Sequence, residues 1–182
     1  MTAQIPDTFL YQGEEYSLVA LEGERLITPQ DYQMQPAMLH TACYRGFYST
    51  YEITDDGLFL TEMVIGEVKE GYKPIQGILP TLPQEDCYGY PTYKGLRLLA
   101  PFSGKIRLAK DFIKELYVHI GYQKATAYKT LLEFTFEAGK LVTMQDISAE
   151  NAKKRGAFKK RFETGNLIQS IEESFSLDFE IE

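Results

Sequence analysis

The strongest constraint on the fold is an Asp-Gly pair placed between two runs of apolar and aromatic residues. Residues 43–54 are rich in Tyr and Phe, residues 58–65 form the second run, and Asp56-Gly57 lies between them. Asp-Gly readily adopts the backbone conformation of a two-residue hairpin turn, and aromatic and β-branched side chains favour a pleated sheet. The pattern therefore predicts that these two runs pair as an antiparallel hairpin.

Two further hairpins are predicted by glycine-containing turns. They are residues 8–12 with 16–21, joined across Gly13, and residues 130–137 with 140–146, joined across Ala138-Gly139. Residues 105–108 form another short apolar run, and residues 175–182 alternate strictly between apolar and polar side chains. Alternation with a period of two is typical of a strand with one buried face.

Helical signals are confined to the C-terminal part of the chain. Ser148 can cap a helix over residues 149–164, Gly165 can end it, and a short helix is expected after Asn166. The expected class is therefore mainly β, at the margin of α+β. We expect antiparallel sheets packed as a sandwich or a partly closed barrel, with a helix near the C-terminus, in a single domain covering residues 1–182.

Residues 66–104 interrupt the regular pattern. They hold five of the eight prolines and six of the fourteen glycines, together with several tyrosines and apolar side chains. A long irregular segment in a compact domain is often a functional loop. We expect a loop held against the body that recognises a partner through Tyr88, Tyr90 and Tyr93, since tyrosine combines apolar area with a polar tip. The structural alternative is a loop that merely covers a sheet edge.

An internal duplication is a second hypothesis about the organisation. Residues 8–65 and 104–147 share an order of features, and residues 148–182 would follow as a C-terminal helix and strand. In such a repeat Asp31 and Asp111 would correspond, as a pair of carboxylates across a pseudo-twofold axis. The alternative for each Asp, which we favour, is a local turn held by bonds to its own backbone.

Charge and leader signals bear on partners and location. The net charge is −7, which disfavours nucleic acid and anionic membranes as partners. The first residues lack the basic and apolar regions of a secretory leader, so none is expected, and no apolar run reaches the ~18 residues of a membrane span. We therefore expect a cytoplasmic protein with reduced cysteines. The basic side chains of the expected helix are interpreted as a solvated face; they are Lys153, Lys154, Arg155, Lys159, Lys160 and Arg161.

Metal and catalytic sites are not predicted. Only two of the candidate ligands His40, Cys43, Cys87 and His119 are closely spaced, whereas zinc sites usually draw ligands from two short-spaced pairs. No nucleophile elbow and no phosphate-binding glycine loop occurs. We expect no metal, no cofactor and no catalytic residue. The alternative is a hydrolase-like enzyme that uses His40 or His119 as acid and base.

Arg45 is a candidate binding residue because it lies in the aromatic run at 43–54. On the more apolar face of a strand its guanidinium needs a carboxylate or carbonyls as partners. A structural ion pair and an anion-binding arginine both meet that need, and the structural pair is the commoner outcome.

Three segments resemble stretches of uncharacterised bacterial proteins: Gly13-Glu-Glu-Tyr-Ser-Leu18, Thr41-Ala-Cys-Tyr-Arg-Gly-Phe-Tyr48 and Leu116-Tyr-Val-His-Ile-Gly-Tyr122. The resemblance implies a bacterial, cytoplasmic origin and no activity. From the residues we expect a non-enzymatic binding protein. Its partner, a protein or a small ligand, would lie near the tyrosine-rich loop, Arg45, His40 and His119.

Overall fold

The computed structural model describes residues 2–84, 89–162 and 175–179. Among the described residues, strands hold far more residues than helices do, so the expected mainly β class is confirmed. The strands are β1 (Thr8–Tyr11), β2 (Glu14–Gly23), β3 (Phe47–Thr54), β4 (Gly57–Ile65), β5 (Thr92–Tyr93), β6 (Leu98–Leu99), β7 (Gly104–Phe112), β8 (Tyr128–Glu137) and β9 (Lys140–Asp146). The helices are the 3-10 turns η1 (Pro29–Tyr32), η2 (Lys114–Leu116) and η3 (Ala125–Ala127), and α1 (Ser148–Phe162).

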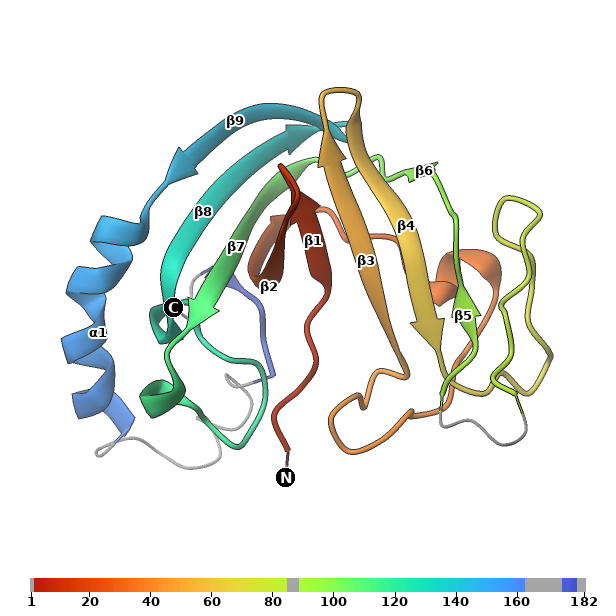
Figure 1. The fold of residues 1–182 in the computed structure, drawn as a ribbon, viewed down its shortest axis with the longest axis horizontal. Coiled ribbons are helices and arrows are strands. Elements are labelled where there is room, and N and C mark those ends of the chain that lie inside the picture. The colour runs from red at the N-terminus through yellow and green to blue at the C-terminus, as the bar shows by residue number, and fades with distance from the viewer. Residues whose placement is uncertain (1, 85–88, 163–174, 180–182) are drawn as a thin grey trace.

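The nine strands form one open sheet in the order β5-β4-β3-β1-β2-β7-β8-β9, with β6 also paired to β4. Figure 1 shows this sheet as an arch, with α1 beside β8 and β9 at one end and β4, β5 and β6 at the other. β1 and β3 are parallel and the other strand pairs are antiparallel. The one parallel pair arises because residues 24–46 form a long crossover between β2 and β3.

The tips of the β3–β4 and β8–β9 hairpins contact each other. The amide of Leu58 donates to the carbonyl of Gly139 at 2.8 Å, and the amide of Gly139 donates to the carbonyl of Phe102 at 2.8 Å. A Cβ on Gly57 would lie only 2.8 Å from the Gly139 oxygen, so this approach depends on a residue without a side chain. The architecture is therefore nearer to the partly closed barrel than to the sandwich.

The predicted hairpins are confirmed, with shifted boundaries. β3 pairs antiparallel with β4, but β3 begins at Phe47, and Gly57 already pairs with Thr54, so Asp55 and Asp56 form the turn. The residues before Phe47 form tight turns instead of a strand. Gly46 has a φ of 79° and a Cβ there would lie 2.5 Å from the carbonyl oxygen of Ala37.

The remaining predicted elements agree in part. β1 pairs with β2, β8 pairs with β9, and α1 begins at Ser148. The described part of the expected C-terminal strand forms one parallel bridge between Asp178 and Leu21, and its last three residues lie outside the described part. The helix expected after Asn166 also lies outside it. None of the described helices is long and apolar enough to span a membrane.

The irregular segment at 66–104 is held against the body, as predicted. It supplies β5 and β6 to the edge of β4, and it buries apolar side chains in the main core. These are Val68, Ile75, Tyr93, Leu96, Ala100 and Phe102. The segment thus serves as part of the core and as the cover of one sheet edge.

The duplication stays a prediction. The hypothesis aligns residues 25–32 with residues 105–112. Residues 105–112 lie in strand β7, whereas residues 25–32 run through a loop into η1. Asp31 and Asp111 have different local partners, which are described below.

Candidate functional site

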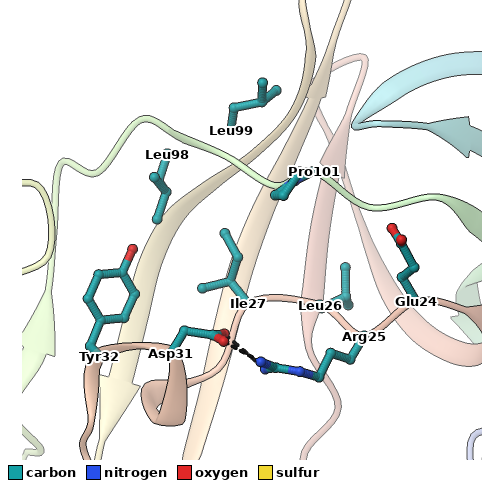
Figure 2. A pocket seen from close by; sticks show the side chains of 9 residues that line it. All are labelled: Glu24, Arg25, Leu26, Ile27, Asp31, Tyr32, Leu98, Leu99 and Pro101. Carbon is teal, nitrogen blue, oxygen red and sulfur yellow. Dashed lines mark hydrogen bonds and ion pairs between the residues drawn. The ribbon is translucent and has the colours of Figure 1, made fainter.

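An open groove of about 670 Å³ lies between residues 24–32 and 98–101 (Figure 2). Most of the side chains on its surface are apolar, and three are charged. They are Glu24, Arg25, Leu26, Ile27, Asp31, Tyr32, Leu98, Leu99 and Pro101. The lining thus combines apolar side chains with a few polar groups, a composition that ligand sites share.

One wall of the groove follows the end of β2. Gly23 has a φ of 107° and a Cβ there would lie 2.6 Å from the carbonyl oxygen of Ser103, so glycine is required at this approach. The amide of Glu24 then donates to the Ser103 carbonyl at 3.0 Å, and the Ser103 amide donates to the Glu24 carboxylate at 2.9 Å. These bonds fix the start of the wall.

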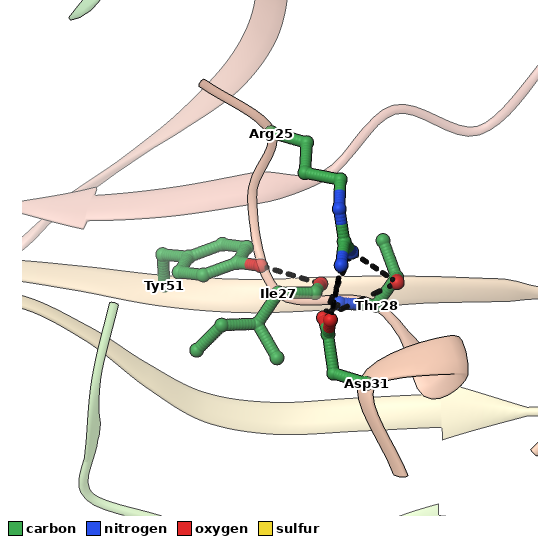
Figure 3. Close-up of polar contacts among 5 residues, drawn as sticks. All are labelled: Arg25, Ile27, Thr28, Asp31 and Tyr51. Carbon is green, nitrogen blue, oxygen red and sulfur yellow. Dashed lines mark hydrogen bonds and ion pairs between the residues drawn. The ribbon is translucent and has the colours of Figure 1, made fainter. Parts of the chain in front are cut away.

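The same wall ends in a polar cluster at η1 (Figure 3). Arg25 donates to both carboxylate oxygens of Asp31 and, at 2.9 Å, to the hydroxyl of Thr28. The Thr28 amide donates to Asp31 at 2.8 Å, so Asp31 also caps the turn. The hydrogen bond from Arg25 is the main reason why the pKa of Asp31 is lowered from 3.8.

The opposite wall is β6 and the residues after it. Leu98 and Leu99 pair with Leu60 and Phe59 of β4, and the amide of Ala100 donates to the carbonyl of Leu58 at 2.8 Å. Leu99 is nevertheless 44% exposed. An apolar side chain that the sheet holds in place and leaves open to solvent is available to a ligand.

A hydrogen bond and apolar packing connect residues of the groove to the main core. The hydroxyl of Tyr51 donates to the carbonyl of Ile27 at 3.0 Å (Figure 3). Ile27, Tyr32 and Leu98 are half-buried and pack against the main core. Burial raises the pKa of Tyr32, and the Asp31 charge raises it further, so its hydroxyl stays protonated as a donor. The hydrogen bond and the core packing thus hold Ile27, Tyr32 and Leu98 in place.

A second pocket, of about 260 Å³, is lined by residues of β1, β2, β7 and β8. Lys110, which lines this pocket, forms an ion pair with Glu14, and its Nζ lies 3.1 Å from the Glu14 carboxylate. Asp111 lies in this lining with a φ of 61°, and its carboxylate accepts from the Thr130 hydroxyl at 2.8 Å. Asp31 pairs with Arg25 instead, and it holds the local turn that we favoured for it. The two carboxylates thus have separate partners in separate pockets.

The two described tyrosines of the predicted recognition loop lie in different environments, and the third lies outside the described residues. Tyr93 is fully buried, donates to the carbonyl of Lys73 at 2.6 Å, and has a pKa raised to about 12 by burial. It belongs to the core and takes no part in the proposal below. Tyr90 is 40% exposed and its ring lies 5.6 Å from that of His40. Tyr88 lies outside the described residues.

The two histidines have local contacts. His40 accepts a hydrogen bond at Nδ1 from the amide of Ala42 at 3.1 Å, which stabilises a tight turn. His119 is exposed, and its ring centre lies 4.9 Å from that of Tyr117, with the two rings nearly perpendicular. Neither histidine lines either of the two pockets described above.

The candidate metal ligands are partly outside the described chain. The buried Cys43 thiol donates to the carbonyl of Phe47 at 3.3 Å, and burial raises the pKa of this thiol. Cys87 lies outside the described residues. Among the residues that are described, no group of three or more His, Cys, Asp or Glu side chains could hold a metal ion.

Arg45 forms a structural ion pair with Asp7, the commoner of the two outcomes expected from the sequence. It donates to both oxygens of the Asp7 carboxylate, at 2.6 and 3.1 Å, and its guanidinium lies 4.7 Å from the ring centre of Phe47. Asp7 also accepts from the amide of Ser49 at 2.7 Å. Because its charge is already balanced, Arg45 is a weak candidate for an anion site.

Comparison of this chain with family models, with curated proteins and with solved structures finds no match.

Proposed function

We propose that this chain is a non-enzymatic binding protein and that the groove between residues 24–32 and 98–101 holds a small organic ligand. The observation that carries the proposal is the mixed lining: the apolar side chains of Ile27 and Leu98 line the groove together with the hydrogen-bonded Arg25–Asp31 pair (Figure 2). The ligand would place an apolar body on the leucines and a hydrogen-bonding group at the pair.

The charges of the lining favour a neutral or cationic ligand. Glu24 and Asp31 are acidic and Arg25 is basic, so the lining carries one net negative charge. The Arg25 guanidinium already makes two bonds to Asp31. An anion would have to displace that carboxylate and approach a chain of net charge −7.

Several observations favour binding over catalysis. The lining of the groove includes no His, Cys or Ser, and both carboxylates accept hydrogen bonds from partners in the fold. A general base needs a pKa near the working pH, whereas the pKa of Asp31 is lowered. The hydrolase-like alternative would depend on His40 or His119, which lie outside this groove.

The proposal includes a bacterial cytoplasmic location and no nucleic acid or membrane partner. The negative charge of the chain supports the absence of polyanionic partners. The exposed Tyr90 beside His40 is a second candidate surface, for a protein partner. Its variants therefore serve as a comparison in tests of the groove.

An NMR titration tests the proposal with three probes that share one ring system: 2-naphthylmethylamine, 2-naphthalenemethanol and 2-naphthoic acid. We expect the amine and the alcohol to shift the amide signals of residues 24–32 and 98–101. The acid should bind more weakly, by about tenfold or more, for the electrostatic reasons above.

Leu99→Gln and Leu79→Gln form a matched pair of variants, because Leu79 is 60% exposed but lies outside the groove. Leu99→Gln should weaken binding of the amine by about fivefold, as expected from partial loss of one apolar contact. Leu79→Gln and Tyr90→Ala should leave it unchanged. Equal effects of the two glutamine variants, or shifts centred on Tyr90, would refute the groove as the site.

A further inference from the structure

One edge of β2 is shared by two different parts of the chain. β7 pairs along one edge of β2 as far as Gly23, whereas β1 pairs along the other edge only as far as Ser17. Past β1, the amide of Leu21 donates to the carbonyl of Leu177 at 2.7 Å. Because β7 takes the opposite edge at this point, residues 175–179 cover the stretch of the edge that β1 leaves open.

Three alternate side chains of this segment have separate contacts. Leu177 is half-buried and packs against the main core. The guanidinium carbon of Arg107 lies 4.1 Å from the centre of the Phe179 ring. The ring centres of Phe175 and Tyr44 lie 6.1 Å apart. Backbone bonding to a sheet edge, with alternate side chains in separate environments, is the recognition mode of a peptide that adds a strand.

The attachment of this segment to the sheet is small. In the described part of the chain it makes one bridge to β2, between Asp178 and Leu21, whereas β1 pairs over four residues with each of its two neighbours. Leu177 is only half-buried, and Asp178 is exposed. Elements with few buried contacts open locally at a lower free energy than the whole fold. Residues 175–179 can therefore leave the edge while the sheet stays folded.

We propose that the β2 edge at Leu21 is a docking site for an extended segment of a partner protein, and that residues 175–179 are its resident occupant. The seated residues define the chemistry of the partner: an aromatic side chain, a leucine and a second aromatic side chain at alternate positions. The partner's leucine takes the core contact of Leu177, and its second aromatic ring meets Arg107. The partner binds when the resident segment releases the edge, so residues 175–179 regulate access to it.

A partner protein fits this edge better than a second copy of the chain does. A second copy brings the same residues 175–179 and the same single bridge, so exchange between copies gains no contact and adds the cost of association. A longer extended segment can pair further along β2 than that bridge, and each added backbone bond favours the partner over the resident segment.

A labelled peptide tests the proposal on the full-length chain. The probe is residues 175–182 with a fluorescent label, and fluorescence anisotropy measures its binding. Leu177→Asp places a charge in the core contact of the resident segment and should free the edge. This variant should bind the probe about tenfold more tightly than the unaltered chain, in which a tethered segment competes. Val142→Asp adds the same charge in β9, at a side chain that is 50% exposed, and should bind the probe like the unaltered chain.

Changes in the probe test which side chains the edge recognises. A peptide that carries Leu177→Asp should not bind. A peptide that carries Phe179→Leu stays apolar but loses the ring that meets Arg107, and should bind about fivefold more weakly. The NMR signal of the Leu21 amide should shift when the unaltered probe binds the Leu177→Asp chain.

Equal affinity of the unaltered chain and the Leu177→Asp chain for the probe would overturn the proposal, and so would binding that survives Leu177→Asp in the peptide. A dimer of the unaltered chain in sedimentation velocity, abolished by Leu177→Asp, would assign the edge to exchange between copies instead.

Far-ultraviolet circular dichroism checks that each variant is folded. If Leu177→Asp does not fold, Phe179→Ser takes its place as the variant that weakens the resident segment. Failure of both variants to fold would make the segment an obligatory part of the core and would overturn the proposal. The outcome does not depend on whether the groove binds a ligand, because neither Leu21 nor Leu177 lines the groove.

Discussion

Arg45 donates two hydrogen bonds to the buried carboxylate of Asp7, a residue 38 positions earlier in the chain. The pair joins the segment before β1 to the loop before β3. Asp7 also accepts from the Ser49 amide, so one carboxylate organises both segments.

Asp7→Asn leaves the Arg45 charge without its counter-ion in a largely buried site. We expect this change to lower the free energy of unfolding by about 3–5 kcal/mol, as for other broken buried ion pairs. Urea unfolding measures it. Asp56→Asn is the control, since the Arg97–Asp56 pair is exposed and should contribute less than about 1 kcal/mol. Similar losses in both variants would contradict the structural role of Arg45.

The Arg25–Asp31 pair predicts a pH dependence. The pKa of Asp31 lies below 3.8 in the folded state, so its contribution to stability is present above 3.8 and is lost as pH falls through the lowered value. Arg25→Gln removes the charged hydrogen-bond donor that is the main cause of the lowered Asp31 pKa. Carboxyl ¹³C NMR titration should therefore give a higher Asp31 pKa in this variant than in the unaltered chain. An unchanged pKa would show that Arg25 does not hold the carboxylate in solution.

The tyrosines of the irregular segment should differ in their contributions to stability. Tyr93→Ala removes a fully buried ring and its bond to Lys73, and should cost about 3–5 kcal/mol. Tyr90→Ala removes an exposed ring and should cost within about 0.5 kcal/mol. Thermal unfolding compares them. Equal losses would mean that Tyr90 is as much a core residue as Tyr93.

Nucleic acid should not bind. The net charge of −7 opposes polyanions, and the attraction of individual basic residues is screened over about 8 Å at physiological salt. Fluorescence anisotropy with labelled duplex DNA and RNA should detect no submicromolar binding. Submicromolar affinity lost on replacing Lys159, Lys160 and Arg161 by Glu would contradict this.

The sequence predicted the hairpins because their signals are local. Turn chemistry at Gly13, Asp56-Gly57 and Gly139 and the alternation around them specify which neighbouring runs pair. The parallel pairing of β1 with β3 was not predicted. It is a long-range contact across the irregular residues 24–46, and no short pattern specifies it.

The groove was missed for the same reason. Its walls come from residues 24–32 and 98–101, which are far apart in the sequence and irregular apart from η1 and β6. One local signal was present: Thr28-Pro29-Gln30-Asp31 has the spacing of a capped turn, and the structure forms that cap. The tyrosines at 90 and 93 could not be separated by sequence, because exposure depends on how β5 meets β4.

Intermolecular nuclear Overhauser effects between the ring protons of 2-naphthylmethylamine and the methyl groups of the protein test the central claim most directly. Our account predicts contacts from the ring to the methyl groups of Ile27, Leu98 and Leu99, which line the groove. Contacts confined to the exposed Leu79 or Leu82, or no contacts at saturating amine, would contradict the assignment of the groove as the binding site.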